Sequence, residues 1–410
     1  MTVRIEKSTA KGNVAAPPSK SFAHRLIIGA SIAGGSTVHG VSKSEDMLAT
    51  LDCAAALFGT EYKREGDDIK FLSSDLKGEA KGEAKGDLLC RESGSTIRFF
   101  IPLCLLKDSE CTLRGSERLL SRPLDVYENI CKDQGLTFIR EKDSIKVKGP
   151  LKSGRFTVPG DVSSQFISGL LFALPLLDGD SVIDIVPPVE SKPYIDITLE
   201  ALALFGVFAK WTDEKTISVA GNQKYSPAEV NVEGDYSNAA FLDAFNIIGG
   251  DVKVTGLSEN SVQGDRAYTA IFRNLLIGFS TIDISDIPDL APILMSVAAA
   301  MHGARLTGTR RLKIKESDRG AAMAEELSKF GVRVDVSDDE ITVFAGMLKT
   351  PEKELLSHND HRIAMSLSVL SSLTGGTISG AEAVRKSYPD FFETIKKLGI
   401  EVKEIGNTEE

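Results

Sequence analysis

The sequence predicts an α/β protein of two domains, each built from three copies of one unit that combines strands with two helices. Three observations favour this class. A chain of 410 residues is too long for one ordinary hydrophobic core. A turn, an apolar helix and a β-rich stretch recur along the chain at a spacing of roughly 50–75 residues. Each copy then carries a second, amphipathic helix that ends at or near a glycine.

Each copy is recognised by its turn and apolar helix. In order along the chain these six segments read PPSKSFAHRLIIGASIA, RESGSTIRFFIPLCLL, GDVSSQFISGLLFALPLL, GDYSNAAFLDAFNIIGG, SDIPDLAPILMSVAAAM and SHNDHRIAMSLSVLSSL. The fourth copy begins near residue 231, so we expect one domain of residues 17–230 and another of residues 1–16 with 231–410, with the active site in the cleft between them. The charged stretch 77–86 is expected to be an exposed loop or tether. Repeats alone could also build a clamp or a structural ring.

The composition excludes several classes of function. A formal charge of −10, from 48 Lys and Arg against 58 Asp and Glu, argues against a general nucleic-acid binder. Small anionic substrates remain compatible with it, because the local field in a cleft matters more than the total charge. No apolar run is long enough to span a membrane and the N-terminus does not resemble a signal peptide, so we expect a cytoplasmic protein without a membrane partner. The five cysteines are expected to be reduced, buried thiols, and neither Cys nor His residues show metal-ligand spacing.

The polar residues that could carry chemistry fall at the same place in successive copies, where a strand ends and the apolar helix starts. Free backbone N–H groups and the helix dipole make such turns anion sites. Lys20, Ser21 and Arg25 could together hold a phosphate and a carboxylate. Gly94 would let backbone amides approach an anion closely. Several such turns facing one cleft would concentrate positive potential in an acidic chain.

Other copies repeat this arrangement with different groups. Ser163, Ser164 and Gln165 could bind a phosphate or a polyhydroxylated ring. Asp289 becomes a candidate general base because its sister turns carry cationic or hydroxyl groups. Further candidates are Arg122, Ser191, Tyr194, Lys315, Arg319, Arg362 and Lys386. The ordinary alternative for each is structural, namely a helix cap, a solvated basic end or a surface salt bridge, and for Asp289 a plain cap at the start of its apolar helix.

Taken together, nine motifs resemble the successive signatures of the EPSP synthase family, in the right order from about residue 12 to 395. They read PPSKSFAHR, ESGSTIR, LLSRPL, GDVSSQF, SKPYIDIT, IPD, KIKESDR, NDHRIAM and RKSYPD. The resemblance implies two domains of three βαβαββ units each, an inside-out barrel arrangement that closes around the substrates. This agrees with the six copies seen in the sequence.

The resemblance also implies which residues bind the two substrates. It places 3-phosphoshikimate against Lys20, Ser21, Arg25, Ser163, Ser164, Gln165, Ser191, Asp289 and Lys315. It places phosphoenolpyruvate against Lys20, Gly94, Arg122, Gln165, Arg319, Arg362 and Lys386. The cations of both sets would offset the repulsion between two anionic substrates.

The implied reaction adds the 5-hydroxyl of the shikimate ring to C2 of phosphoenolpyruvate while C3 takes a proton, and the tetrahedral adduct then loses phosphate. It needs a base at the hydroxyl and an acid at the methylene carbon. By resemblance Asp289 is the base, and Glu316 and Lys20 are candidates for the acid and the return transfers. No metal or organic cofactor is implied. Gly94 also suggests inhibition by glyphosate.

Some positions depart from the family pattern. Pro18, His24, Ser95 and Phe99 stand where Gly, Asn, Thr and Pro are usual. Arg311 stands where many relatives place an Asn that contacts the shikimate ring, and it is left out of the predicted site. These changes suggest a divergent branch of the family.

Two other functions are weighed against this one. Enolpyruvyl transfer to a UDP-amino sugar uses the same fold, but that family carries Lys-Asn where Lys20-Ser21 stands here, and a Cys in the loop before the equivalent of Arg122. Residues 116–121 contain no Cys. An RNA 3′-end-processing or clamp-like binder is disfavoured by the acidic charge. The expected partners are therefore small anionic substrates, with no nucleic acid and no partner chain, as a monomer.

Overall fold

The computed structural model describes residues 1–72 and 86–405, which form two compact units. One unit combines Met1–Ser19 with Gly234–Glu410, and the other is Lys20–Glu233. Each has its own buried hydrophobic cluster, one drawn from residues between Phe22 and Val230 and one from Val3–Ala10 together with residues between Tyr236 and Ile400. All but the last residue of the predicted loop 77–86 lies outside the described residues.

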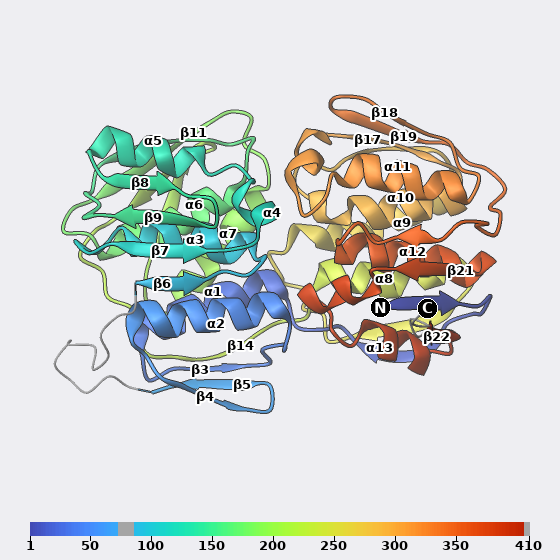
Figure 1. Ribbon diagram of the computed structural model, residues 1–410, viewed down its shortest axis with the longest axis horizontal. Coiled ribbons are helices and arrows are strands. Elements are labelled where there is room, and N and C mark those ends of the chain that lie inside the picture. Colours follow the sequence, from blue (N-terminus) through green and yellow to red (C-terminus); the bar gives the residue numbers. More distant parts are fainter. Residues whose placement is uncertain (73–85, 406–410) are drawn as a thin grey trace. The chain divides into compact units, whose positions relative to one another are not determined.

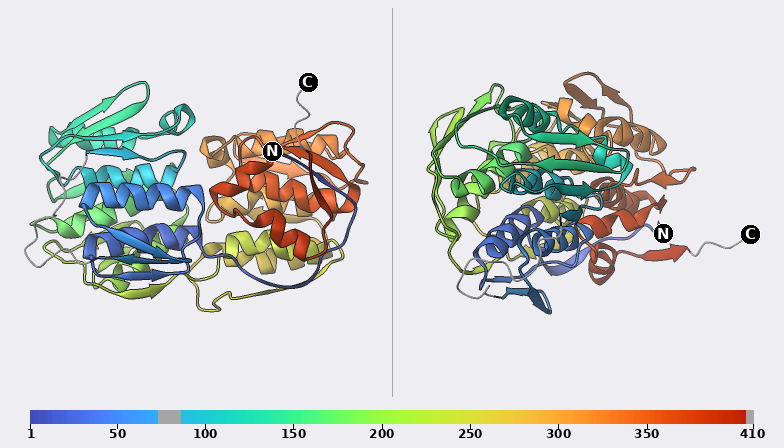
Figure 2. Two further views of the ribbon diagram at one scale, coloured as in Figure 1. Left: turned by 60° about the horizontal axis from the view of Figure 1, so that its bottom comes forward. Right: turned by 60° about the vertical axis from the view of Figure 1, so that its left-hand side comes forward.

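The unit Lys20–Glu233 is built around three apolar helices that start at the turns singled out in the sequence. These are α1 (Lys20–Ala33), α3 (Gly94–Cys104) and α6 (Ser164–Ala173), and they are buried along most of their length. The amphipathic helices of the same copies are α2 (Glu45–Phe58), α5 (Asp125–Gln134) and α7 (Lys192–Leu204). Helices α2 and α5 end at Gly59 and Gly135, which take the left-handed conformation that favours glycine. Helices α1 and α2 lie side by side, in blue in Figure 1 and Figure 2.

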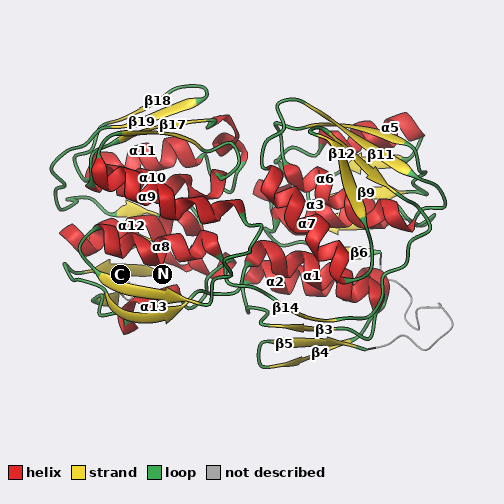
Figure 3. Ribbon diagram, turned by 180° about the vertical axis from the view of Figure 1, so that it is seen from behind, coloured by secondary structure: helices red, strands yellow, loops and turns green. Residues whose placement is uncertain are grey.

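Three four-stranded sheets cover these helices, and each has one parallel and two antiparallel pairs. The first sheet has the spatial order β14 (Glu229–Asn231), β3 (Thr37–His39), β5 (Asp68–Phe71) and β4 (Tyr62–Glu65). The second has the order β6 (Asp87–Leu89), β7 (Cys111–Arg114), β9 (Ser144–Lys148) and β8 (Thr137–Arg140). The third has the order β10 (Arg155–Pro159), β11 (Ser181–Val186), β13 (Thr216–Val219) and β12 (Ala209–Asp213). Strands such as β7 and β13 alternate buried and less buried residues, because one face packs on the helices. In Figure 3, the strands β14, β3, β5 and β4 lie outside α1 and α2.

The other unit repeats this plan. Its apolar helices are α8 (Tyr236–Ile247), α10 (Ala291–Ala300) and α12 (His361–Thr374), and its outer helices are α9 (Tyr268–Ile277), α11 (Arg319–Lys329) and α13 (Phe391–Lys397). Its sheets are β20 (Leu355–Leu356), β21 (Gly376–Ser379), β1 (Thr2–Ile5) and β22 (Val402–Ile405); β16 (Ser280–Asp283), β17 (Ala304–Thr307), β19 (Glu340–Val343) and β18 (Val334–Val336); and the pair β15 (Asp251–Thr255) and β2 (Lys11–Ala15). The predicted α/β class with repeated βαβαββ units is therefore confirmed.

Short helical segments complete the connections. They are α4 (Glu117–Leu120), η1 (Leu174–Leu176), η2 (Gly264–Ala267), η3 (Pro288–Leu290), η4 (Arg310–Ile314) and η5 (Ala381–Lys386). No helix among the described residues is both long and apolar enough to cross a membrane. All five cysteines are buried and free, as the sequence predicts.

Three strands pair with segments far away in the chain. Strand β2 directly precedes the first apolar helix of the unit Lys20–Glu233, yet it belongs to the other unit, where it pairs in parallel with β15. The first copy instead takes β14, from the far end of its unit, as the parallel partner of β3. Strand β1 lies between β21 and β22, so the N-terminal strand is internal to a sheet formed otherwise by residues 355–405 (Figure 1).

Candidate active site

In the unit Lys20–Glu233, side-chain hydrogen bonds join the first turns of α3 and α6. Gln165 Nε2 donates to Ser95 Oγ at 2.9 Å, and Arg98 Nη1 donates to Gln165 Oε1 at 2.8 Å. Arg98 is almost completely buried and lies over the Phe166 ring, with its second amino group on the Pro123 carbonyl. The nitrogen and the oxygen of the Gln165 amide are therefore both hydrogen-bonded, which fixes the orientation of the amide group.

Arg25 joins α1 to α6 and α7. Its buried guanidinium donates to Thr198 Oγ1 at 2.7 Å, to the Tyr194 carbonyl at 2.9 Å and to Ser168 Oγ at 3.3 Å. It also donates to the Ser21 carbonyl at 2.6 Å. Burial lowers the pKa of Arg25 to about 9. Arg25 thus holds together three helices whose starts carry predicted ligands.

Lys20 lies at the first position of α1, and its Nζ is 2.5 Å from Asp46 Oδ2. Asp46 stands in the first turn of α2 and is buried. The ammonium group is therefore held by an acidic partner from the neighbouring helix. Asp46 is not among the site residues predicted from the sequence. The signal that could have identified it is an acidic residue in the first turn of a predicted helix.

Gly94 and Arg122 lie in direct contact. A Cβ atom built on Gly94 would be 2.4 Å from Arg122 Nη1 and 2.9 Å from its Cζ. Only a residue without a side chain leaves the guanidinium in this position. Both residues are predicted phosphoenolpyruvate ligands, and the structure brings them together.

The four predicted serines lie at helix starts, and Ser21 is the second residue of α1. Ser163 caps α6, with its Oγ accepting the Gln165 N–H at 3.3 Å, and Ser164 is the first, buried residue of that helix. Ser191 precedes α7 and is buried, with a φ of +57°. A non-glycine residue in the left-handed region carries strain, which concentrates at functional positions.

In the other unit, Asp289 is the centre of an ion-pair cluster. Its Oδ1 accepts from Arg319 Nη1 at 2.8 Å and its Oδ2 from Arg362 Nη2 at 2.9 Å, while Lys315 Nζ is 3.5 Å from Oδ1. Burial alone would raise the pKa of Asp289, but Arg362, Lys315 and Arg319 hold it well below its usual range. Asp289 is therefore ionised, and it gathers three predicted ligands of the substrates.

Arg319 uses all sides of its guanidinium within this cluster. Beyond Asp289, it donates from Nε to Asp360 Oδ2 at 2.9 Å and from Nη2 to Glu316 Oε2 at 2.7 Å. Its side chain is 1% exposed. Burial would lower the pKa of Arg319, but the three carboxylates raise it above its usual value. Asp360 also caps α12 through the Arg362 N–H, and sequence analysis did not single it out.

Burial lowers the pKa of Lys315 to about 8, against the opposing attraction of Asp289. The charges of Arg319 and Arg311 lower it further. Arg311, which was left out of the predicted site, is buried and donates to the Ser285 carbonyl. Its charge therefore acts on the site through Lys315.

Lys386 lies at the end of η5 and is buried, although on its own the sequence suggests a surface lysine. Its Nζ donates to the Asn359 carbonyl at 2.7 Å. His358 and Asn359 both take the left-handed conformation, with φ of 51° and 54°. This strained turn precedes Asp360 and Arg362, so Lys386 is placed beside the start of α12.

The structural alternative for Asp289, a plain helix cap, does not apply. The residues that cap η3 and α10 are Ile287 and Leu290, and the Asp289 carboxylate accepts from the cations. Lys315 precedes α11, which starts at Arg319 and is capped by Asp318. Lys315 and Arg319 both contact Asp289.

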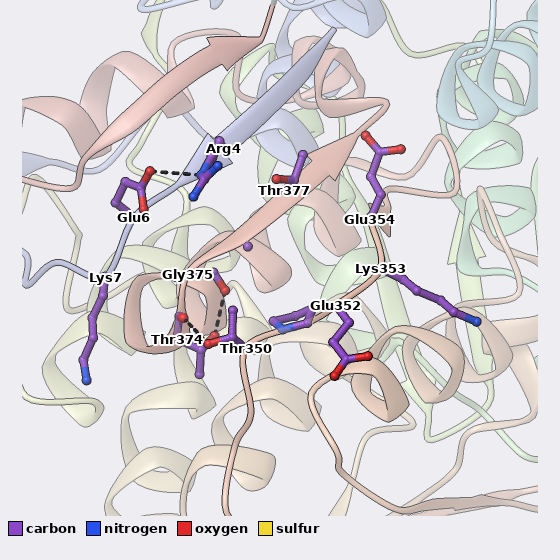
Figure 4. Close-up of a pocket in the computed structure, with 12 residues that line it drawn as sticks. Arg4, Glu6, Lys7, Thr350, Glu352, Lys353, Glu354, Thr374, Gly375 and Thr377 are labelled. Carbon is purple, nitrogen blue, oxygen red and sulfur yellow. Dashed lines mark hydrogen bonds and ion pairs between the residues drawn. The ribbon is translucent and has the colours of Figure 1, made fainter.

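Other polar groupings lie apart from these residues. A pocket of about 490 Å³ is lined by residues including Arg4, Glu6, Thr350, Thr374 and Gly375, at the end of α12 opposite to Arg362 (Figure 4). No predicted site residue lines it.

Glu325, Glu326 and His358 hold their ligand atoms close enough together for a metal ion. Lys329 Nζ already lies 2.9 Å from both carboxylate oxygens of Glu326, and His358 Nε2 lies 2.9 Å from one of them. The charge of the buried carboxylate is thus offset by an ammonium group. This arrangement does not point to a metal site.

Comparison with known proteins agrees with this geometry. A family model described as EPSP synthase (3-phosphoshikimate 1-carboxyvinyltransferase) matches residues 5–395. Proteins named 3-phosphoshikimate 1-carboxyvinyltransferase from Clostridium kluyveri, Clostridium novyi and Brachyspira hyodysenteriae are 38%, 39% and 38% identical to the chain, covering 97–98% of it and 97–100% of their own lengths. A solved structure of EPSP synthase from Acinetobacter baumannii matches with a TM-score of 0.79 at 25% identity, covering 98% of this chain and 100% of that one. The chain belongs to the EPSP synthase family.

Proposed function

We propose that the chain transfers the enolpyruvyl group of phosphoenolpyruvate to the 5-hydroxyl of 3-phosphoshikimate and releases phosphate, in the shikimate pathway that leads to chorismate. The observation that carries this proposal is similarity over nearly the whole length to relatives named for this reaction. The cation-rich helix starts supply the chemistry, since both substrates are anions. The cytoplasmic location and the monomeric state stay predictions.

Phosphoenolpyruvate is assigned to Arg319, Arg362 and Lys386 in one unit and to Lys20, Gly94, Arg122 and Gln165 in the other. The buried positions of Arg319, Arg362 and Lys386 support this, because a substrate anion there would meet largely desolvated cations. The contact of Gly94 with Arg122 supports the other half. Both units would have to act on the same molecule.

3-Phosphoshikimate is assigned to Lys20, Ser21, Arg25, Ser163, Ser164, Gln165, Ser191, Asp289 and Lys315. The hydroxyl-rich starts of α6 and α7 suit a ring with several hydroxyl groups. Arg25 already makes four hydrogen bonds within the protein, so its main role is to hold α1, α6 and α7 together.

Proton transfer is assigned to Asp289, Glu316 and Lys20. The 5-hydroxyl loses its proton as its oxygen bonds to C2 of phosphoenolpyruvate, and C3 gains one. Asp289 is ionised and can accept a hydrogen bond from the hydroxyl, but its depressed pKa makes it a weak base while three cations surround it. Substrate anions that draw Arg319 and Arg362 away would strengthen it as a base.

The reaction is tested with the choice of acceptor. Purified protein given phosphoenolpyruvate and 3-phosphoshikimate is expected to release inorganic phosphate, measured by a colorimetric assay. UDP-N-acetylglucosamine in place of 3-phosphoshikimate is expected to give none. Release with the amino sugar alone would assign the chain to the other enolpyruvyl transfer.

Replacing Asp289 by Asn is expected to lower kcat by roughly 100-fold or more, because the amide keeps the shape of the carboxylate but cannot take a proton. Binding of both substrates, measured by calorimetry, should change far less than kcat. The matched control is Asp251→Asn on the exposed face of β15, which should leave kcat unchanged. An unchanged kcat in Asp289→Asn would remove Asp289 from the catalytic residues.

Replacing Gly94 by Ala is expected to raise KM for phosphoenolpyruvate by about tenfold, because the new methyl group displaces Arg122 and weakens a charged hydrogen bond to the substrate. KM for 3-phosphoshikimate should stay within about twofold of the wild-type value, because the new methyl group would not collide with the residues predicted to bind this substrate. Gly278→Ala is the control, since its Cβ would meet no atom within 4 Å. Equal changes in both KM values would argue against the assignment of Arg122.

The pKa of Lys315 predicts a pH limit. The Lys315 side chain is positively charged below pH about 8 and loses its charge above it. We therefore expect kcat/KM for 3-phosphoshikimate to fall above this pH, by up to about tenfold per pH unit. Lys315→Arg keeps the charge at all these pH values and should move the fall to higher pH. The same alkaline limb in both proteins would show that another group is responsible.

A further inference from the structure

The first turn of α8 is held by acceptors from the protein, as the Asp360-capped start of α12 is. Asp235 caps the helix by accepting the Asn238 N–H at 2.9 Å, and Gln263 Oε1 accepts the Tyr236 N–H at 3.0 Å. N–H groups that would bind an anion at this turn are thus already taken by protein acceptors.

Gln263 clamps the segment before α9 onto the start of α8. Its amide donates to the Gly234 carbonyl at 2.8 Å as well as accepting the Tyr236 N–H, and its own N–H donates to Ser261 Oγ at 3.1 Å. This places Asp265, two residues further on in η2, against Ser237 in the first turn of α8. Both side chains are buried, and the Ser237 hydroxyl lies near enough to the Asp265 carboxyl group to lower its pKa by hydrogen bonding.

Ser237 connects Asp265 to the ion-pair cluster. Arg362 Nη1 donates to Ser237 Oγ at 2.5 Å, while its Nη2 donates to Asp289. A hydroxyl has one hydrogen to donate, and since Ser237 Oγ accepts from Arg362, that hydrogen is available for the Asp265 carboxylate. The two amino groups of Arg362 are thus held by two different acids, one directly and one through a hydroxyl.

The charges around Asp265 come from three elements. Burial is the largest influence and raises the pKa of Asp265 to about 7, and the charge of Asp289 adds to this. Arg362 and the Ser237 hydroxyl oppose the increase, while Asp235 on α8 supports it. On its own element the Arg266 guanidinium donates to the Ser261 carbonyl. The carboxyl group is consequently poised to change its ionisation state near neutral pH.

We propose that Asp265 is a positioning residue for phosphoenolpyruvate, which fixes the guanidinium of Arg362 through the Ser237 hydroxyl and takes up a proton when the substrate anion binds. This inference rests on the proposed function, in which Arg362 is a phosphoenolpyruvate ligand. An anion at Arg362 brings negative charge close to Asp265, which favours its neutral form. The proton removes one negative charge from the buried cluster as the substrate adds its own.

The sign of the pH effect follows from this arrangement. Below pH about 7 Asp265 is neutral, and Arg362 is more available to the substrate; above it the carboxylate is ionised and competes for the guanidinium. KM for phosphoenolpyruvate in the wild type should therefore rise between pH 6 and 8 by up to about tenfold. The substrate's own titration affects wild type and variants equally, so the comparison is made between them.

The experiment compares Asp265→Asn, Asp265→Ala and the control Asp251→Asn across this pH range, with KM for each substrate and kcat measured separately. Asn keeps an oxygen for the Ser237 hydroxyl but cannot ionise, so its KM for phosphoenolpyruvate should show only the substrate's own pH dependence. Ala removes the acceptor, so KM for phosphoenolpyruvate should rise about tenfold at every pH. KM for 3-phosphoshikimate should be unchanged in all three.

Calorimetry supplies a readout that does not depend on turnover. Phosphoenolpyruvate binding to the wild type at pH 7, in two buffers of different ionisation enthalpy, should show proton uptake that Asp265→Asn largely abolishes. An active wild type whose pH profile and proton uptake persist in Asp265→Asn would overturn this inference alone, as would an equal loss for both substrates in Asp265→Ala. A wild type that neither binds nor uses phosphoenolpyruvate would overturn the proposed function, and the inference with it.

Discussion

The ion-pair cluster around Asp289 is the constraint on which the rest of its unit depends. Buried cations are unfavourable unless they are paired, and Asp289 pairs with Arg319, Arg362 and Lys315 at once. These residues come from the ends of three different segments, so the cluster fixes the relative position of the starts of α10, α11 and α12. A carboxylate that organises the cations is also placed among the groups that an anionic substrate would approach.

The unit Lys20–Glu233 reaches a similar convergence with mostly neutral groups. Gln165, Ser95 and Arg98 link the starts of α3 and α6, and Arg25 links α1 to α6 and α7 through hydroxyl and carbonyl acceptors. The candidate residues of one unit are therefore held mainly by charge, and those of the other mainly by directional hydrogen bonds. Salt screens surface charge more than buried charge, so both arrangements remain effective in the cell.

Much of this plan could be predicted from the sequence, because local patterns determine helix starts. The apolar runs after PPSKS, GST and DVSSQ form the helices expected, since turn residues and hydrophobic periodicity act over a few positions. Contacts over long separations could not be predicted. Asp46 beside Lys20, Arg98 behind Gln165 and the buried environment of Lys386 depend on tertiary packing. So do the ion pairs of Asp289, for which the sequence leaves a plain helix cap as the structural alternative.

The strand β1 has a consequence for the order in which the molecule is completed during synthesis. It lies between β21 and β22, whose residues emerge from the ribosome nearly four hundred positions later. The unit Lys20–Glu233 is continuous and can close its last sheet once β14 is made. The other unit has to keep its first two strands without their final neighbours until residues 251–405 exist. The unit that contains the Asp289 cluster is therefore completed later than the unit Lys20–Glu233.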